Sequence, residues 1–170
     1  MFAWRTWLPI LALLLAGCRP DASRVAELDA AGAAELRANV TGHPRLIHFW
    51  ATTCPPCVAE FPQLATLAGE IKAKGVEFIT ISFDPAGDTA KVDAFLARHD
   101  PSGNGRHFLW NGGKASQVSE AIDPDWTGAI PHSLVVAPGG QIVWRHVGPA
   151  DPDEVRRVLT KTPAPLETPK

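Results

Sequence analysis

The sequence predicts an α/β protein with one mixed central sheet and helices on both of its faces. Short apolar segments typical of buried strands alternate with longer segments whose apolar residues recur at helical spacing. The last third of the chain changes this pattern, because two strand-like segments follow each other across Pro138-Gly139-Gly140, a hairpin signal. The order βαβαβ followed by ββα indicates a sheet with both parallel and antiparallel strands.

Length and composition are those of a single folded domain. The chain has 170 residues, 45% of them hydrophobic, and its 16 basic and 18 acidic side chains nearly balance. This composition excludes a disordered chain, which combines low hydrophobicity with high net charge. It also provides no strongly basic segment, so no nucleic acid is expected as a partner.

Residues 1–17 are predicted to be a lipoprotein signal peptide. They carry one cation and no acid, and their apolar run at 8–16 is too short to span a bilayer, which takes about 20 residues. The run ends in the sequence LAGC at 15–18, which resembles a bacterial lipobox, where cleavage leaves a lipidated N-terminal cysteine. The alternative is an ordinary cleaved signal with an incidental cysteine. We expect an exported protein, lipid-anchored to a bacterial membrane on its periplasmic side through Cys18, with 18–22 as its linker.

The first half of the domain, which we place at 23–160, alternates strand and helix. Asp29 is expected to cap the first helix, and Pro44 marks the start of the second strand. The helix that begins at Pro55 has one apolar stripe, with Gly75 at its end. The next strand is apolar almost throughout, as a strand buried on both faces should be. The expected elements are strands at 23–28, 45–51 and 76–83 and helices at 29–39 and 55–74.

The second half continues this alternation and ends in the hairpin and a last helix. Asp88 is expected to cap a helix, and 100–106 has the composition of a loop. Asp151 is followed by a proline and acids at the first helical positions, which marks the start of the last helix. Residues 161–170 are predicted to be a proline-rich tail. The remaining expected elements are strands at 107–110, 132–137 and 141–147 and a helix at 114–122.

The segment Cys54-Pro55-Pro56-Cys57 lies where a predicted strand ends and a predicted helix begins. A helix start offers unpaired backbone N–H groups and the positive end of the helix dipole, and both favour a thiolate over a thiol. Two intervening residues place the second sulfur within disulfide distance of the first. Cys54 is expected to be the exposed nucleophile, and Cys57, inside the helix, to resolve the mixed disulfide. The pattern therefore predicts a redox-active dithiol.

The surrounding residues resemble the TlpA/ResA-type thioredoxin-like family of exported, membrane-anchored thiol–disulfide oxidoreductases. The resemblance lies in FWATTCPPC at 49–57 with Glu60 and Phe61-Pro62 after it, and in Ile130-Pro131, which resembles the family's cis-proline segment. It implies a thioredoxin-like fold over about 23–159, with an extra helix–strand unit that we place at 88–110.

The same resemblance implies a function and partners. Family members commonly serve cytochrome c maturation, so we expect reduction of protein disulfides and an upstream membrane thiol reductant. We expect a monomer and no dissociable cofactor. Glu60 matches an acid implicated in proton movement near the disulfide, with a surface carboxylate as the alternative, and Pro131 matches the cis-proline that presents the backbone to an extended substrate. The substrate groove is expected to include Trp50, Pro55, Pro56 and Ile130.

Two positions depart from the family's pattern. Thr53 stands where an aromatic residue usually precedes the first cysteine, so an aromatic shield beside the disulfide is missing. His48 stands where the family usually has Asn or Asp. Because a histidine titrates near neutral pH, His48 is a candidate for proton transfer, with a hydrogen-bonded core histidine as the alternative. Strand alternation leaves open whether it points toward the sulfur or away.

Three alternatives to a redox enzyme of this type stay open. A structural disulfide across two residues closes almost no loop and would add little stability. A copper-handling metallochaperone would bind metal through Cys54 and Cys57, but further soft ligands would be needed, and the only other cysteine is Cys18. A peroxide-reducing, peroxiredoxin-like enzyme would want a threonine three residues before its reactive cysteine, where Ala51 stands.

Overall fold

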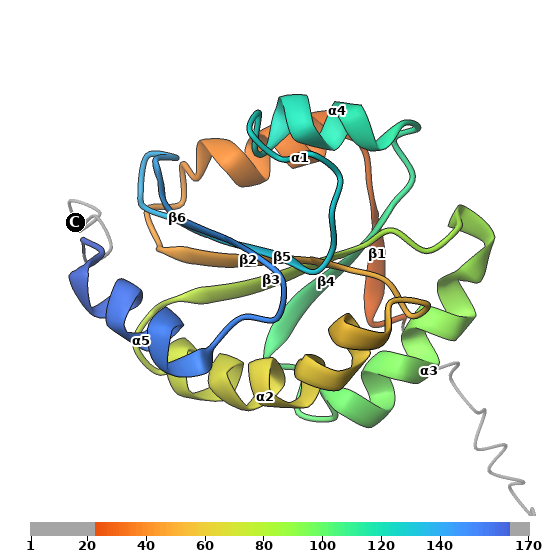
Figure 1. The fold of residues 1–170 in the computed structure, drawn as a ribbon, viewed down its shortest axis with the longest axis horizontal. Helices are drawn as coiled ribbons and strands as arrows, with labels where there is room; N and C mark the ends of the chain where they lie inside the picture. Colours follow the sequence, from red (N-terminus) through yellow and green to blue (C-terminus); the bar gives the residue numbers. More distant parts are fainter. Residues whose placement is uncertain (1–22, 164–170) are drawn as a thin grey trace, which may run out of the picture.

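The structure, a computed structural model, describes residues 23–163 and is built on a six-stranded sheet (Figure 1). Its strands are β1 (Val25–Leu28), β2 (Arg45–Trp50), β3 (Glu77–Ser82), β4 (Gly105–Trp110), β5 (His132–Val136) and β6 (Ile142–Val147). They lie in the order β1-β4-β3-β2-β5-β6. β1, β4, β3 and β2 pair in parallel with one another, whereas β5 is antiparallel to both of its neighbours, β2 and β6. The prediction of a mixed sheet is confirmed.

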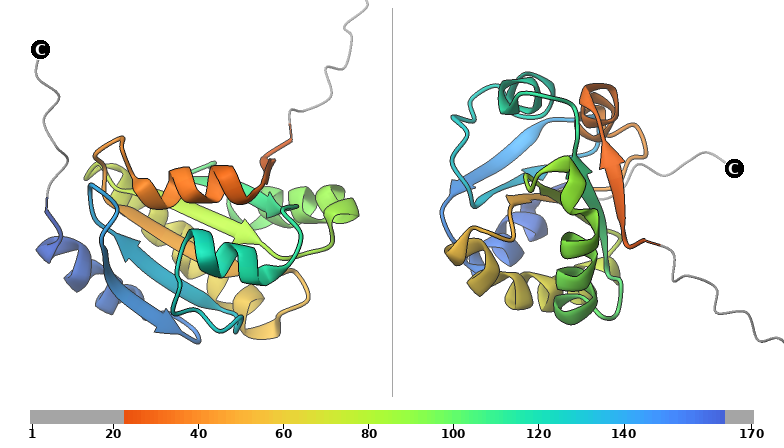
Figure 2. Two further views of the ribbon diagram at one scale, coloured as in Figure 1. Left: turned by 90° about the horizontal axis from the view of Figure 1, so that it is seen from above. Right: turned by 90° about the vertical axis from the view of Figure 1, so that its right-hand side faces the viewer.

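Helices cover both faces of this sheet, as predicted. They are α1 (Ala30–Ala38), α2 (Pro55–Lys72), α3 (Thr89–His99), α4 (Ala115–Ala121) and α5 (Pro152–Lys161), with a short 3-10 helix, η1 (Ala86–Asp88), before α3. α1 and α4 lie side by side on one face, and α2, α3 and α5 lie on the other (Figures 1 and 2). α3 and β4 fill the segment where the extra helix–strand unit was expected, and β4 lies between β1 and β3.

Local signals in the sequence set most of the helix ends. The side chains of Asp29 and Asp151 accept hydrogen bonds from backbone N–H groups two or three residues further on, both at 2.9 Å, and so cap α1 and α5. Gly75 follows α2 with a φ of 75°, a conformation that favours glycine. Asp88 stands at the cap position of α3 but makes no capping bond, since its carboxylate lies 3.6 Å from Lys91 instead.

Several expected boundaries differ from the observed ones by one or two residues: β1 begins at Val25 rather than at 23, and α2 ends at Lys72 rather than at 74. β4 begins at Gly105 rather than two residues later, because the carboxylate of Asp100 accepts hydrogen bonds from the N–H groups of Asn104 and Gly105 and holds this part of the loop extended. Gly105 thereby pairs with Phe78 in β3. At the other end of the domain, α5 extends through Lys161, so this residue belongs to the helix and not to the tail.

The two faces of the sheet carry separate cores, and β2 contributes to both. Ile47 and Phe49 point into the core under α1 and α4, whereas Leu46 and Trp50 point into the cores under α2, α3 and α5. Alternate residues of a strand point to opposite faces, so His48 shares the face of Leu46 and Trp50. His48 therefore lies beneath α2.

The predicted signal peptide, the predicted lipidation site Cys18 and the linker at 18–22 lie outside the described residues, as does the tail from 164 onward. Within 23–163, no helix has the length and apolar character needed to cross a membrane.

Candidate active site

The disulfide between Cys54 and Cys57 lies at the N-terminus of α2, with the two Cα atoms 5.3 Å apart. Cys54 is the N-cap residue, and its Sγ accepts a hydrogen bond from the backbone N–H of Cys57 at 3.3 Å. Cys54 keeps 9% of its surface exposed, whereas Cys57 has none. Cys54 is thus the more accessible of two largely buried cysteines, and its sulfur is the one that accepts from the helix N-terminus, as expected of a nucleophile beside a resolving thiol.

Three of the expected groove residues lie at the surface beside the disulfide. Pro55 and Pro56 are exposed on the first turn of α2. Ile130 is half-buried and packs against the core cluster that contains both cysteines. The Ile130–Pro131 peptide bond is cis, as the resemblance implied.

Trp50 does not line this groove, and its assignment there is wrong. The residue has no exposed surface, and its ring packs 4.7 Å from the rings of both Phe61 and Phe95. As the last residue of β2 it points inward, between the sheet and α2 and α3. Trp50 is a core residue that supports the active-site helix from below.

Glu60 lies three residues after Cys57 on α2 and is buried, with 6% of its surface exposed. Its Oε2 accepts a hydrogen bond from the N–H of Ala150 at 2.7 Å, while its Oε1 has no hydrogen-bond partner in the described part of the chain. Burial raises the pKa of Glu60 to about 7, against the opposing effect of the Ala150 hydrogen bond. Glu60 is therefore not a surface carboxylate.

His48 is completely buried below Glu60. Its Nδ1 lies 2.9 Å from Ser133 Oγ, and its Nε2 lies 3.9 Å from Glu60 Oε1 without a hydrogen-bond partner among residues 23–163. Burial, together with the charge of His132, lowers the pKa of His48 to about 3. A neutral ring whose Nδ1–H donates to Ser133 leaves Nε2 as an acceptor that faces Glu60.

The two pKa values together define the charge state of the His48–Glu60 pair. Between pH 3 and pH 7 the imidazole is neutral and the carboxyl group is protonated, so the pair holds one acidic proton, on Glu60. Above about pH 7 that proton leaves. The pair can therefore accept a proton from a neighbouring group near neutral pH, which is the requirement for a general base.

Asp84 is a buried residue of this region that the sequence analysis did not identify. Its carboxylate accepts hydrogen bonds from the backbone N–H of Thr52 at 2.8 Å, from the Thr52 hydroxyl and from Ser82 Oγ at 2.6 Å. Asp84 follows β3 just as Cys54 follows β2, and parallel neighbouring strands end at the same edge of a sheet. This shared edge is the signal that could have identified it.

A second histidine–carboxylate pair, His132 and Asp123, lies on the face covered by α1 and α4. His132 Nδ1 is 3.0 Å from the carbonyl oxygen of His146, and Nε2 is 2.9 Å from Asp123 Oδ2. Both ring nitrogens of His132 therefore have a polar partner. Asp123 also accepts a hydrogen bond from Arg145 Nε at 3.0 Å.

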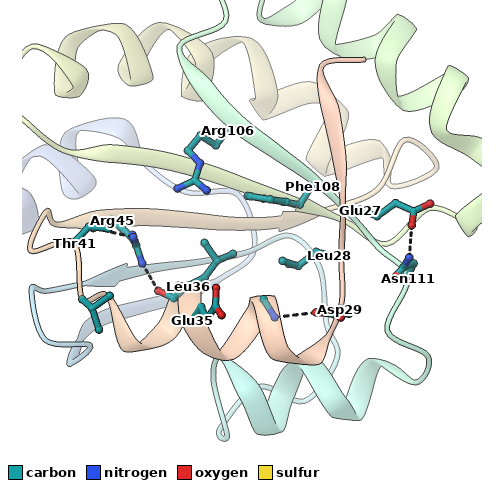
Figure 3. Close-up of a pocket in the computed structure, with 12 residues that line it drawn as sticks. Glu27, Leu28, Asp29, Glu35, Leu36, Thr41, Arg45, Arg106, Phe108 and Asn111 are labelled. Carbon is teal, nitrogen blue, oxygen red and sulfur yellow. Dashed lines mark hydrogen bonds between the residues drawn. The ribbon is translucent and has the colours of Figure 1, made fainter. Parts of the chain in front are cut away.

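A cavity of about 490 Å³ lies elsewhere, between α1, β1 and β4 (Figure 3). Arg45 lines it, but the guanidinium already donates to the Leu36 carbonyl and the Thr41 hydroxyl. Neither Cys54 nor Cys57 lines this cavity. In the described region, no three His, Cys, Asp or Glu side chains lie close enough together to hold a metal ion.

Comparison with known proteins agrees with this site. The family model described as Redoxin matches residues 20–161. The thiol-disulfide oxidoreductase ResA of Oceanobacillus iheyensis is 32% identical over 61% of this chain and 49% of its own, so this chain spans about half the length of that relative. The thiol:disulfide interchange protein HelX of Rhodobacter capsulatus is 31% identical over 89% of this chain and 77% of its own.

The fold is also found among solved structures. The crystal structure of a thiol:disulfide interchange protein of the thioredoxin family from Chlorobium tepidum matches with a TM-score of 0.59 and 21% identity, covering 74% of this chain and 83% of the other. This match confirms the thioredoxin-like fold, and the family model covers most of the chain. The chain belongs to the Redoxin family and, within it, to the thioredoxin-like proteins of the TlpA/ResA type.

Proposed function

We propose that this protein is a thiol–disulfide oxidoreductase that reduces disulfides in other proteins. The observation that carries the proposal is the cysteine pair at the start of α2, in which Cys54 is the less buried of the two and its Sγ accepts a hydrogen bond from the helix N-terminus. The similarity of this chain to proteins named as thiol–disulfide oxidoreductases or interchange proteins supports the same chemistry. The disulfide is the redox centre, and no dissociable cofactor takes part.

The reaction starts from the reduced dithiol. The thiolate of Cys54 attacks one sulfur of a substrate disulfide, which forms a mixed disulfide and releases the other substrate sulfur as a thiolate. Cys57 then loses its proton and attacks Cys54 Sγ. This step releases the first substrate sulfur and forms the Cys54–Cys57 bond. The substrate gains two electrons and two protons in all, and the protein is oxidised to its disulfide form.

The second step needs a base, because Cys57 has no exposed surface and an apolar setting disfavours its thiolate. Glu60 lies one helical turn away, and its pKa of about 7 suits a group that takes up a proton at neutral pH. Nε2 of His48 faces Glu60 Oε1 at 3.9 Å, and the ring stays neutral at this pH because burial lowers its pKa to about 3. We assign proton transfer to Glu60, with His48 as its buried partner.

The substrate segment is proposed to lie across the surface that surrounds Cys54. Pro55 and Pro56 form one side of this surface and Ile130 the other, with Pro131 presenting the backbone of Ile130 to an extended chain. The direction is reductive, and an upstream membrane thiol reductant restores the dithiol. Cytochrome c maturation is the proposed setting, on the strength of the resemblance to the TlpA/ResA type.

We further propose an exported monomer, held to a bacterial membrane on its periplasmic side by a lipid on Cys18 after removal of residues 1–17. The sequence LAGC at 15–18 supports this placement. Cys18→Ala should release the protein from membranes while Cys54→Ser, which keeps the anchor, stays with them. Membrane association of Cys18→Ala would contradict the lipid anchor without touching the redox proposal.

The redox proposal is tested by trapping. Cys57→Ser should accumulate mixed disulfides with substrate proteins, because nothing resolves them quickly, and Cys54→Ser should form none. Both variants are compared on non-reducing gels with and without dithiothreitol. Covalent adducts of Cys54→Ser but not of Cys57→Ser would reverse the roles of the two cysteines. Adducts with neither variant, together with a parent that leaves substrate disulfides intact, would contradict the function.

A further inference from the structure

The loop that carries Cys54 is attached to the neighbouring strand by one buried carboxylate. Between the end of β2 and the start of α2 the chain makes a turn, in which the N–H of Cys54 donates to the carbonyl of Ala51 at 3.1 Å. Thr52 is the second residue of this turn. Both its backbone N–H and its hydroxyl donate to Asp84, one to each carboxylate oxygen.

Asp84 is itself held from two further directions. Ser82, at the end of β3, donates its hydroxyl to Oδ2 at 2.6 Å. Nζ of Lys91, from α3, lies 3.6 Å from Oδ1 and also 3.6 Å from Asp88. The side chain of Asp84 has no exposed surface. The carboxylate therefore joins the active-site turn, the central sheet and the inserted helix–strand unit at a single point.

These contacts make Asp84 a fixed anion rather than a proton carrier. Burial alone would raise the pKa of Asp84, but the hydrogen bonds from Ser82 and Thr52 and the charge of Lys91 outweigh burial and lower it. A carboxylate that accepts several hydrogen bonds at once gives up its geometry only at a high cost. Asp84 thus differs from Glu60, whose pKa burial raises to about 7.

We propose that Asp84 is a positioning residue for the thiol–disulfide reaction, which holds the Ala51–Cys54 turn so that Cys54 Sγ stays against the N–H of Cys57. The thiolate gains from this contact only while the sulfur remains aligned with the helix N-terminus. When the tether to Thr52 is lost, the turn gains freedom and the sulfur loses part of that alignment. The inference rests on the proposed function for its meaning, but the reactivity of the thiol can be measured without any substrate.

The test measures how fast Cys54 is alkylated by iodoacetamide across a pH range. The full chain is used in its reduced form with Cys57→Ser as the background, and mass spectrometry of the peptide that contains Cys54 separates its reaction from that of Cys18. Thr52→Val removes the hydroxyl donor and leaves the charge of Asp84 in place, whereas Asp84→Asn removes the charge and half of the acceptor capacity. Both should slow alkylation at neutral pH by about two- to fivefold and move its midpoint to higher pH.

Asp100→Asn is the control, because Asp100 is another buried carboxylate that accepts backbone N–H groups of a loop, at Asn104 and Gly105, and that also faces a buried side chain, His107, at 3.0 Å. It should leave the alkylation profile within about twofold of the background protein. Faster alkylation in Asp84→Asn with an unchanged Thr52→Val would mean that Asp84 acts through its charge alone and would overturn the proposal. Unchanged alkylation profiles in both Thr52→Val and Asp84→Asn would also overturn the proposal. An equal slowing of alkylation in Asp100→Asn would do the same. If Asp84→Asn does not fold, Thr52→Val decides alone.

Discussion

His132 and Asp123, on the α1/α4 face of the sheet, lie 2.9 Å apart, and every ring nitrogen and carboxylate oxygen of that pair has a partner. His48 and Glu60, on the α2 face, lie 3.9 Å apart, and each has a buried atom without a hydrogen bond in the described structure. Both pairs are buried, and the two histidines belong to adjacent strands. The two pairs differ in their surroundings. The pair with unsatisfied atoms, His48 and Glu60, lies beneath α2, the helix that carries the disulfide.

The difference separates a structural role from a chemical one. A buried histidine–carboxylate pair whose polar atoms all have partners holds its elements in place. Unsatisfied buried polar atoms cost stability and call for an explanation where they occur. For Glu60 and His48, the explanation we propose is that this pair takes up the proton that Cys57 must release.

The largest contrast is in stability. Asp123→Asn should lower the free energy of unfolding by about 3 kcal/mol, because the buried carboxylate that faces both His132 and Arg145 is replaced by an amide with a single acceptor oxygen. Glu60→Gln should cost less than about 1 kcal/mol, since the amide can still accept from Ala150 and can donate to His48 Nε2. Urea unfolding of the oxidised protein at pH 7 measures both. Equal losses would make Glu60 a structural residue like Asp123.

The pH dependence of stability should expose the two members of the unsatisfied pair separately. Glu60 has a native pKa of about 7 against 4.5, so the native state holds an extra proton between these values and loses stability as the pH rises through them. His48 has a native pKa of about 3 against 6.5, so the native state holds one proton fewer and gains stability as the pH rises. Between pH 4.5 and 6.5 the two effects offset each other.

Single substitutions should remove this compensation. As the pH rises from 4.5 to 6.5, the free energy of unfolding of Glu60→Gln should increase by about 1–2 kcal/mol relative to that of the parent. The free energy of unfolding of His48→Asn should decrease by a similar amount over the same range. Urea unfolding at a series of pH values gives the two difference curves. Parallel curves for parent and variants would mean that neither group titrates abnormally in the folded protein.

The two pairs also show where prediction from sequence succeeds and where it ends. The position of Cys54 and Cys57 follows from local signals, because the prolines and the apolar stripe of α2 lie within one stretch of chain. The orientation of His48 does not, since every residue of β2 is buried and period-two alternation cannot tell one buried face from the other. Asp84 was missed for a related reason, because its partner Thr52 is 32 residues away.

The inward position of Trp50 was missed for the same physical reason as the orientation of His48. A strand buried on both faces has no polar side to indicate which aromatic residues reach the surface at its end. The strand itself was placed to within one residue of its observed end. Element types and most starts were therefore predictable from short-range patterns, while the environment of each side chain depended on residues far along the chain.

A smaller effect is expected on the rate of the reaction itself. Glu60→Gln should slow the release of substrate from the mixed disulfide about tenfold at pH 7 and abolish the midpoint of the pH–rate profile near pH 7. Asp123→Asn should leave this rate unchanged per folded molecule. Stopped-flow measurement of release, corrected for the folded fraction, makes the comparison. A profile that changes only in His48→Asn would assign the proton to the histidine.

The smallest effect tests the hydrogen bond that selects the form of His48. Ser133→Ala removes the acceptor of Nδ1–H, so the ring is expected to carry its proton on Nε2 instead and to donate it toward Glu60. A donor favours the charged carboxylate, so the pKa of Glu60 should fall, and release at pH 6 should become about twofold faster. Thr80→Val is the matched control, because Thr80 is the neighbour of His48 in β3 and its hydroxyl lies 2.9 Å from His107 Nδ1 in the same way. If both variants shift the pH–rate profile equally, the effect belongs to the core in general, whereas a shift in Ser133→Ala alone places His48 in contact with the proton on Glu60.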